Sequence, residues 1–411
     1  MNLIIVFFAT IGCLTALTLS EIASAANCLP ATLSSSKNER STEDLEKITD
    51  AVLDTSRKYV LHPQGTNVEL SVHEFTTPTT GKPLVISPGF GEDCTKYAEF
   101  VFDMSDYGPI YCINHLGQSP QSIRDQIKSV NGTTYRLADS PRVDKLATDL
   151  RHLIAHVKQQ NGGAKPSVFG HSMGGKIVMR AIQFPSMSEL INKNVVLSAP
   201  HLGYSKTPIN AKGELTGPKD AVEEAFARTC SRLSSSTSLQ GLFESLSMIV
   251  GGRIGIDEST LSKLSCFKCQ GSDGPLAASK PKTHQLTSSK IRGDFFYGNA
   301  KFAEYGAIPT CGTARWAGMG LLDQANIEQQ MRALRSTFPT TPLILLPGMD
   351  VYADNAVAMK YQRMFPEQIS TRTIDRANTA NGHCQHEPIF EVKECRDQAI
   401  SAMRCHFEGT R

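Results

Sequence analysis

The sequence lacks an excess of charge of either sign. Its 42 Lys and Arg residues nearly balance its 40 Asp and Glu residues, which leaves a formal net charge of +2 at pH 7. Neither a large basic surface for nucleic acid nor an acidic tail for a basic partner is indicated, so we expect no nucleic-acid partner. No internal repeat is visible, and 411 residues suffice for one large domain with an insertion.

Paired metal-ligand spacings are also missing. Cys266 and Cys269 form a C-x-x-C, but no second C-x-x-C and no paired His follows at the spacing of zinc ligands. Of the 11 cysteines, Cys13 lies in an apolar segment at the N-terminus, which leaves ten. An even, high count favours disulfides in an exported protein, although the sequence does not give the pairing.

Positive charge is absent ahead of that N-terminal apolar segment. Residues 3–19 carry no charge and are followed by Ala23-Ser24-Ala25, small residues at the spacing that signal peptidase recognises. The segment is short for a membrane span. We therefore predict that residues 1–25 are a signal peptide, cleaved near Ala25, and that the protein is secreted or periplasmic. An uncleaved membrane anchor is the alternative.

Short apolar runs alternate with amphipathic segments along much of the remaining chain. Apolar runs predict buried strands at 84–86, 110–113, 167–169, 194–198 and 342–346, and alternation predicts a half-buried strand at 68–75. Helical spacing predicts helices at 97–104, 143–159, 176–183, near 354–364 and from about 390, with a last strand near 369–374. This alternation is typical of an α/β protein with a mostly parallel, doubly wound sheet.

The alternation is interrupted over residues 203–340, which are rich in Ser, Gly and Lys. We interpret this segment as a cap, or lid, inserted into a core made of residues 26–202 and 341–411. Residues 26–55 are polar, and 34–42 have the composition of a flexible lead-in.

The segment Gly170-His171-Ser172-Met173-Gly174 is a G-x-S-x-G motif between a predicted strand and a predicted helix. In that context the glycines allow a tight turn that lifts a serine hydroxyl above the sheet edge, so we predict Ser172 as a nucleophile. An oxyanion hole needs two backbone N–H groups. The candidates are Met173, at the helix N-terminus, and Phe90, in the Gly-containing segment 87–92.

A serine nucleophile needs a base and an orienting acid, which follow it in the order acid, then His. Asp350 comes just after the strand at 342–346 and is the preferred acid. Asp354 is the alternative, although it is better placed to cap the next helix. His383 and His386 are both candidate bases, and local sequence leaves the choice open.

These motifs resemble the monoacylglycerol-lipase and lysophospholipase branch of the α/β-hydrolases, bacterial lysophospholipases above all. The similar segments are Pro88-Gly89-Phe90-Gly91-Glu92 with Lys96-Tyr97, the Gly-His-Ser-Met-Gly-Gly turn, Leu197-Ser198-Ala199-Pro200 and Asp350-Val351-Tyr352-Ala353-Asp354. The chain departs from the family where Asn114 replaces a usual Asp and Leu116 a usual Arg.

The resemblance also separates the two histidines. In that branch the base is followed directly by Glu, then by Glu five residues and Arg ten residues after the His. Glu387, Glu391 and Arg396 stand at these distances from His386. The resemblance therefore implies His386 as the base and His383 as the alternative.

Taken together, the motifs and the resemblance imply a carboxylic ester hydrolase that uses Ser172, Asp350 and His386 and forms an acyl-enzyme. The expected substrate is a small-molecule or lipid ester, a lysophospholipid or a monoacylglycerol, and transient contact of the cap with a membrane surface is a further expectation. We expect no metal and no organic cofactor. The alternatives are a peptidase or an acyltransferase on the same fold, and a catalytically inactive binding protein.

Overall fold

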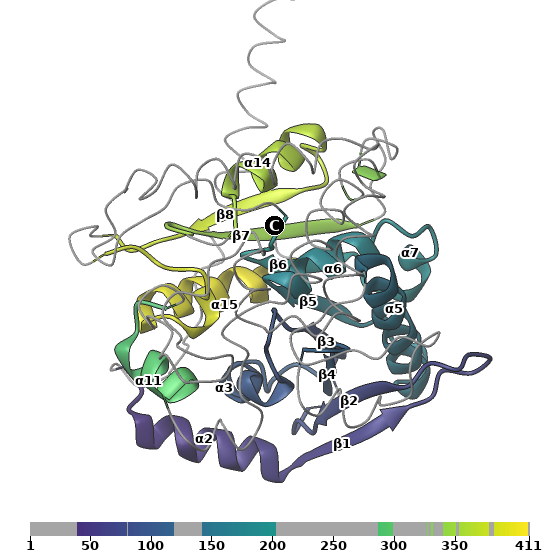
Figure 1. Cartoon of the computed structure of the whole chain (residues 1–411), viewed down its shortest axis with the longest axis horizontal. Coiled ribbons are helices and arrows are strands. Elements are labelled where there is room, and N and C mark those ends of the chain that lie inside the picture. Colours follow the sequence, from purple (N-terminus) through teal and green to yellow (C-terminus); the bar gives the residue numbers. More distant parts are fainter. Residues whose placement is uncertain are drawn as a thin grey trace, which may run out of the picture.

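An eight-stranded sheet in the order β1-β2-β4-β3-β5-β6-β7-β8 runs through the computed structural model (Figure 1). The structure describes residues 39–79, 81–118, 142–202, 287–298, 327, 330–331, 340–350, 353–377 and 382–409. The predicted signal peptide, the C-x-x-C and most of the predicted cap lie outside these residues.

The sheet is mostly parallel, as the sequence predicts. Its parallel strands are β3 (Leu84–Ser87), β4 (Ile110–Asn114), β5 (Ser167–His171), β6 (Asn194–Ser198), β7 (Thr341–Pro347) and β8 (Ser370–Ile374). At one edge β1 (Ser56–Leu61) and β2 (Leu70–Phe75) pair antiparallel. The chain runs from β3 to β4 on one side, then crosses back over β3 to β5 and continues to β8 at the other edge. This reversal of strand order is typical of a doubly wound sheet.

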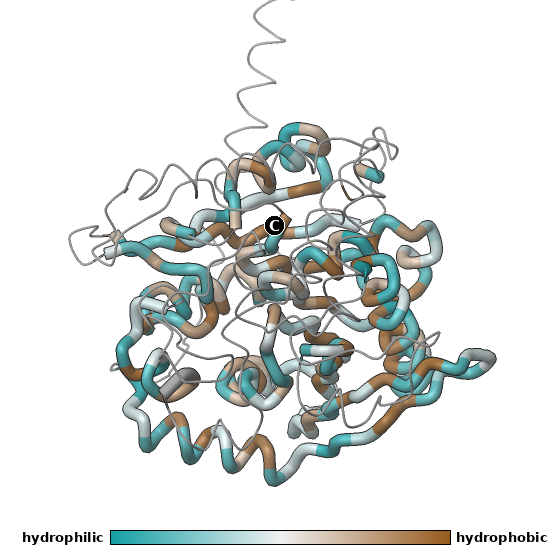
Figure 2. The backbone as a smooth tube through the Cα atoms, in the orientation of Figure 1, coloured by the Kyte–Doolittle hydropathy of each residue, from teal (hydrophilic) through white to brown (hydrophobic). Residues whose placement is uncertain are grey.

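Helices cover both faces of the sheet because alternate strand residues point to opposite sides. Val85 belongs to one apolar cluster with α5 (Val143–Gln160), α6 (Met173–Ala181), α7 (Met187–Leu190) and α14 (Asn355–Met364). Its neighbours Leu84 and Ile86 belong to a second cluster with α2 (Thr42–Asp54), α3 (Ala98–Asp103), α11 (Lys290–Gly298), η4 (Pro388–Phe390) and α15 (Lys393–Glu408). Figure 2 shows apolar residues, in brown, along the strands and at intervals along the helices.

The prediction of a flexible lead-in is wrong for residues 39–42. Ser41 caps α2: its hydroxyl accepts from the Asp44 N–H and the Asp44 carboxylate accepts from the Ser41 N–H, which is a capping box. The sequence analysis also did not predict α2 and β1. In α2, Leu45, Ile48, Val52 and Leu53 recur at helical spacing, a signal that the sequence analysis did not use. In β1, the exposed Arg57 and Lys58 precede only three apolar residues, which end at Leu61.

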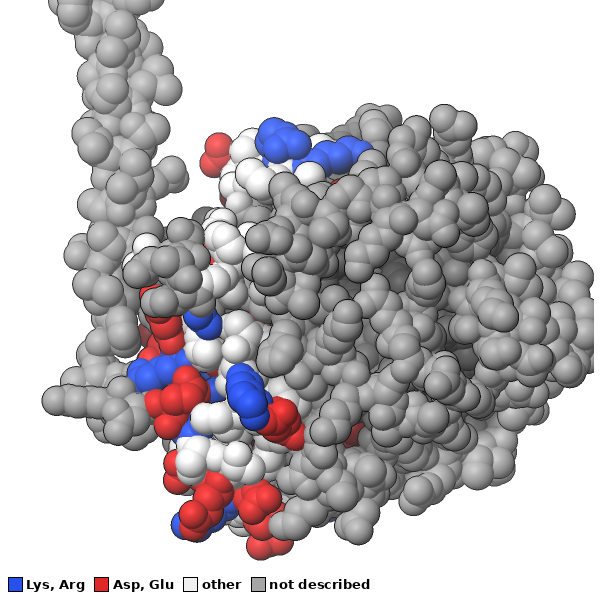
Figure 3. Space-filling model, turned by 60° about the vertical axis from the view of Figure 1, so that its left-hand side comes forward, with Lys and Arg blue, Asp and Glu red and all other residues white. Residues whose placement is uncertain are grey.

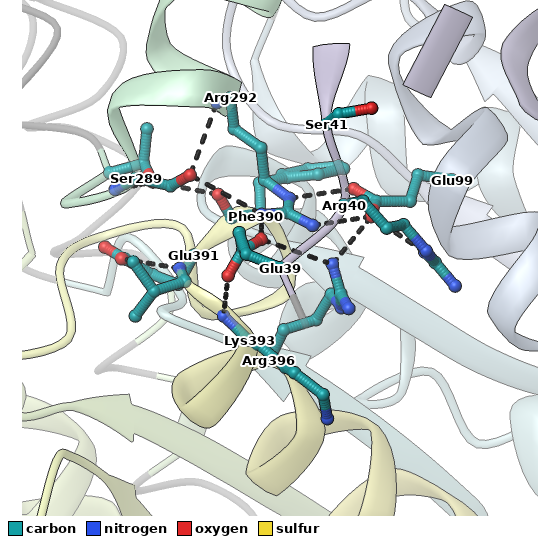
Figure 4. Close-up of polar contacts among 12 residues, drawn as sticks. Glu39, Arg40, Ser41, Glu99, Ser289, Arg292, Phe390, Glu391, Lys393 and Arg396 are labelled. Atoms are coloured by element: carbon teal, nitrogen blue, oxygen red, sulfur yellow. Dashed lines mark hydrogen bonds and ion pairs between the residues drawn. The ribbon is translucent and has the colours of Figure 1, made fainter. Parts of the chain in front are cut away.

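A buried cluster of charges joins the segment just before α2 to α3, α11 and α15 (Figure 4). Glu99, which is 2% exposed, accepts hydrogen bonds from Arg40 at 2.7 Å, from Arg292 at 2.7 and 2.9 Å, and from Arg396 at 2.7 Å. Asp103 pairs with Arg40 at 2.5 Å. We call these five residues the arginine cluster. It fixes α11, within the predicted cap segment, against the core.

Two disulfides lie in the described part of the chain, Cys94–Cys112 and Cys384–Cys395. None of the described helices is long and apolar enough to cross a membrane.

Figure 3 shows acidic and basic side chains side by side on the described part of one face. Exposed pairs such as Lys290–Asp294 and Lys47–Glu43 are of this kind, consistent with the balanced net charge.

Candidate active site

Ser172 occupies the turn between β5, which ends at His171, and α6, which begins at Met173. Its backbone has φ 51° and ψ −116°, a positive φ that a non-glycine residue adopts only where its surroundings enforce it. Two hydrogen bonds supply that constraint: the Ser172 N–H donates to the Ser198 carbonyl at 2.9 Å, and the Ser172 carbonyl accepts from the His201 N–H at 2.9 Å. The turn is thus strained and held from both sides.

Two glycines make this turn sterically feasible. A side chain at Gly174 would collide with the carbonyl oxygens of Ser87 and Pro88, and one at Gly170 would collide with the carbonyl of Gly174. The strand, the helix and the loop after β3 therefore approach one another at backbone distance. This is the structural context that gives the G-x-S-x-G pattern its meaning.

Ser172, His386 and Asp350 meet at the carboxyl end of the sheet. The Ser172 Oγ lies 2.8 Å from His386 Nε2, and His386 Nδ1 lies 2.8 and 2.9 Å from the two carboxylate oxygens of Asp350. Asp350 Oδ1 also accepts from the Ala353 N–H at 2.8 Å, which fixes the carboxylate. Because His386 and Asp350 are 4% and 9% exposed, their contact is shielded from solvent.

The alternative acid and base have other partners. Asp354 caps α14, where its carboxylate accepts from the Ala356 N–H at 3.0 Å. His383 Nδ1 lies 2.8 Å from Asp375 Oδ2 and is one-third exposed. The structure therefore brings Asp350 and His386 to Ser172, and it places His383 beside Asp375.

The environment of His386 favours its protonated form. Burial alone would lower its pKa, but the Asp350 carboxylate opposes this, and Glu387 and Glu92 add to the effect, so the pKa of His386 is raised above 6.5. His201, whose N–H fixes the turn, is buried, and burial lowers the pKa of its imidazole well below 6.5. His386 is therefore the imidazole of this pair that gains a proton most readily.

The two predicted oxyanion donors lie on elements that border Ser172. Met173 is buried at the first position of α6, where the helix dipole favours negative charge. Phe90 belongs to the loop of residues 88–92, which we call the oxyanion loop. Its neighbour Gly89 passes so close to His171 that an added Cβ would lie 3.1 Å from the imidazole, and the Gly91 N–H donates to Gln118 at 3.0 Å.

The sequence analysis missed a set of buried contacts around this site. Lys96, in η1 (Cys94–Tyr97), bridges Glu92 at 2.7 Å and Glu387 at 2.6 Å. The four-residue spacing of Glu92 and Lys96 was a local signal for the first pair, whereas the second joins residues 291 positions apart. Asn114, a departure from the family pattern, accepts from the Cys94 N–H at 2.9 Å and so helps to hold the start of η1.

No group of three or more His, Cys, Asp or Glu side chains in the described ranges could hold a metal ion. At the site a hydroxyl contacts an imidazole, which in turn contacts a carboxylate. This geometry is similar to that of the nucleophile, base and acid of serine hydrolases on several unrelated folds.

The fold is that of the α/β-hydrolases. Residues 80–248 match the model of the family described as serine aminopeptidase, S33. No curated protein matches the chain in sequence.

Solved structures show the same fold at low sequence identity. A soluble variant of monoglyceride lipase from Saccharomyces cerevisiae, in complex with a substrate analog, is 13% identical with a TM-score of 0.52; the match covers 87% of this chain and 98% of that one. A carboxyl esterase from Bacillus coagulans is 13% identical with a TM-score of 0.53, over 87% and 99%. A lipase in its open form is 15% identical with a TM-score of 0.55, over 86% and 99%. These likenesses confirm the α/β-hydrolase fold and agree with the resemblance drawn from the sequence motifs.

Proposed function

We propose that the protein is a serine hydrolase of carboxylic esters with Ser172 as its nucleophile. The observation that carries the proposal is the continuous contact from the Ser172 hydroxyl through His386 to Asp350, with distances of 2.8 Å on each side of the imidazole. A serine hydroxyl is a weak nucleophile until a neighbouring base accepts its proton. The strained backbone at Ser172 supports the same interpretation, because such strain concentrates at functional sites.

In this mechanism His386 Nε2 accepts the Ser172 proton while the serine oxygen attacks the acyl carbonyl. Asp350 holds the imidazole with Nδ1–H toward the carboxylate and stabilises the imidazolium that forms. The N–H groups of Phe90 and Met173 stabilise the negative oxygen of the tetrahedral intermediate. His386 then protonates the leaving alcohol, and water activated by His386 releases the acid from the acyl-enzyme.

We propose lysophospholipids or monoacylglycerols as the substrate class. The support is the resemblance of the oxyanion loop and of the segment that begins at Asp350 to that branch. A fold shared with a monoglyceride lipase and a lipase adds to it. The segment 203–340 would then act as a cap over the acyl chain, with transient contact to a membrane surface. Export by a cleaved N-terminal signal is part of the same proposal, since the two disulfides fit an oxidising compartment.

A second candidate function is peptide hydrolysis. The specific observation in its favour is the family model itself, which is described by a serine aminopeptidase. The same three side chains would serve an amide as well as an ester, since acyl transfer to serine is common to both. One experiment is therefore needed to test the reactivity of Ser172, and a second to separate ester substrates from peptide substrates.

A fluorophosphonate probe tests the nucleophile, because it reacts only with an activated serine. We expect the wild-type protein to be labelled and Ser172→Ala to remain unlabelled; an unlabelled wild-type protein would support an inactive binding protein instead. Hydrolysis of lysophosphatidylcholine, a monoacylglycerol and aminoacyl anilides then separates the two candidate functions. Cleavage confined to the anilides would overturn the ester assignment.

A further inference from the structure

Glu92 is a buried carboxylate that joins several parts of the candidate site. Its Oε2 accepts hydrogen bonds from the Gly89 N–H at 2.5 Å and the Tyr97 hydroxyl at 2.5 Å, and it lies 3.2 Å from His171 Nδ1. Its Oε1 accepts from Lys96 Nζ at 2.7 Å. The side chain is 4% exposed, so these contacts form in a low-dielectric interior where they are strong.

Lys96 carries the connection from Glu92 to the loop that holds the base. Its ammonium group is 1% exposed and lies 2.6 Å from Glu387 Oε1, the residue next to His386. It also lies 4.7 Å from the centre of the Phe390 ring, a cation–π distance in η4 of the same loop. One buried ammonium thus holds Glu92 of the oxyanion loop and Glu387 of the segment 382–390, which we call the base loop, together.

A second path runs through the residue before the nucleophile. His171 Nδ1 faces Glu92 Oε2, and His171 Nε2 lies 3.3 Å from the backbone carbonyl of His386. Glu92 is therefore tied to the base loop both through Lys96 and through His171. Both paths end at adjacent residues, 386 and 387.

Stability alone is a poor explanation for this arrangement. Removing three charged groups from water is costly, and apolar residues of similar volume often stabilise a protein as well or better. A buried charge network does, however, fix the relative position of the groups that it joins. Here the joined groups are the loop that contains the Phe90 N–H and the loop that contains the His386 imidazole.

We propose that Glu92 is a positioning residue for the hydrolytic reaction, which holds the oxyanion loop at Gly89 and the base loop through Lys96 and Glu387. The inference rests on the proposed function and deepens it. Its geometric consequence is that the oxyanion donors and the base keep one relative position during the formation of the tetrahedral intermediate. A displacement of about 1 Å in such a site costs on the order of 100-fold in rate.

The same network has an electrostatic consequence for His386. The groups that face or surround its ring are Asp350, Glu387, Glu92, Lys96, His171 and His201. The negative charges of Glu387 and Glu92 contribute to the raised pKa of His386. Loss of either charge leaves Lys96 less compensated, so the pKa of His386 is expected to fall.

The test compares Glu92→Gln, Glu387→Gln and Tyr97→Phe with the wild-type protein on a p-nitrophenyl ester. For Glu92→Gln we expect kcat to fall by about 10- to 100-fold with little change in KM, because the loss is one of alignment. The acid limb of its pH profile should move to lower pH, and that of Glu387→Gln should move the same way. Tyr97→Phe removes a donor to Glu92 but no charge, so it should lower kcat without that shift.

The matched control is Asp93→Asn. Asp93 is the neighbouring carboxylate, and it accepts from the Thr95 N–H at 2.9 Å to cap η1, a bond that an asparagine retains. We expect this variant to keep kcat and the pH profile close to wild type. Circular dichroism and fluorophosphonate labelling give the folded, reactive fraction to which every rate is normalised.

A wild-type kcat and pH profile in folded Glu92→Gln would overturn the inference. If that variant does not fold, wild-type behaviour of both Glu387→Gln and Tyr97→Phe would overturn it equally. Failure of the proposed function is a separate result, since the wild-type protein would then neither react with the probe nor cleave the ester.

Discussion

Ser172 and His386 are 214 positions apart in the sequence, and their side chains meet at 2.8 Å. The serine is fixed by the turn between β5 and α6, whereas the histidine lies on an irregular loop before η4. The contact therefore depends on what holds that loop. Among the features that do so are the Asp350 carboxylate, the Cys384–Cys395 disulfide and the Lys96–Glu387 ion pair.

Substitutions of Asp350 and of Asp354 test which of these two aspartates orients the base. Asp350→Asn should lower kcat by about 10⁴-fold, because an amide no longer selects the imidazole tautomer that accepts the serine proton. Asp354→Asn should leave activity near wild type, since asparagine also caps a helix well. Steady-state kinetics of both variants on one ester decide the matter, and equal losses would contradict the assignment of Asp350.

The two histidines allow a similar comparison. His386→Ala should lower kcat by about 10⁶-fold, as removal of a base that acts as one unit with the serine does in other hydrolases. His383→Ala removes only the pair with Asp375 and should retain most of the activity. The reverse outcome, measured as kcat at saturating substrate, would make His383 the base.

The pH dependence follows from the raised pKa of His386. The base must be neutral to accept the serine proton, so activity should fall as the pH drops through its pKa. Because Asp350, Glu387 and Glu92 raise that pKa above 6.5 despite burial, the midpoint of the acid limb should lie above pH 6.5. A profile of kcat/KM from pH 4 to 9 measures it, and a midpoint below 6.5 would contradict this account.

The disulfide between Cys384 and Cys395 closes a loop of 11 positions that contains His386. Replacing both cysteines by serine should lower the free energy of unfolding by about 3 kcal/mol in the loop-entropy model. It should also lower kcat, because the base loop loses one of its restraints. Urea unfolding and steady-state kinetics measure the two effects; an unchanged kcat would contradict a role of the disulfide in positioning His386.

A substitution in the arginine cluster should have a large effect on the free energy of unfolding and a small effect on kcat. Glu99→Gln leaves Arg40, Arg292 and Arg396 around a neutral amide, and an uncompensated buried charge typically costs about 3–5 kcal/mol. Folded molecules should keep their kcat on a short ester, because none of these side chains contacts Ser172, His386 or Asp350 in the described structure. Glu43→Gln, in an exposed pair with Lys47, is the control and should change little.

How far the sequence could predict the fold depended on burial. Strands such as β3 and β5, buried along their whole length, were visible as apolar runs, and α5 was visible from its amphipathic spacing. The edge strand β1 was not, because its first half carries the exposed Arg57 and Lys58 and its pattern does not alternate. The helix α2 had a readable signal in its capping box, Ser41 and Asp44, which the sequence analysis did not use.

For the candidate site, a residue could be predicted where it lies in a local sequence motif, and not where its role depends on a distant contact. Ser172 and Asp350 could be predicted because each follows a strand in a short local motif. The two histidines could be predicted because they follow the acid in the order expected for such a site. Local sequence could not choose between His383 and His386, since that choice depends on distances to Ser172. The contact of Lys96 with Glu387 was hidden for the same reason: it joins segments that only the folded sheet brings together.

The pairing of β6 with β7 has a consequence for how such a protein diversifies. These strands are hydrogen-bonded neighbours, from Asn194 opposite Thr341 to Ser198 opposite Leu345, although the segment 203–340 separates them in the sequence. A detour that leaves and re-enters the sheet at adjacent strands behaves as a loop whose closure entropy grows only with the logarithm of its length. Changes of length in that detour therefore cost little in loop-closure entropy. Changes at its described end cost more, because Arg292 pairs with Glu99 and Ser288 bonds Glu391 of the core.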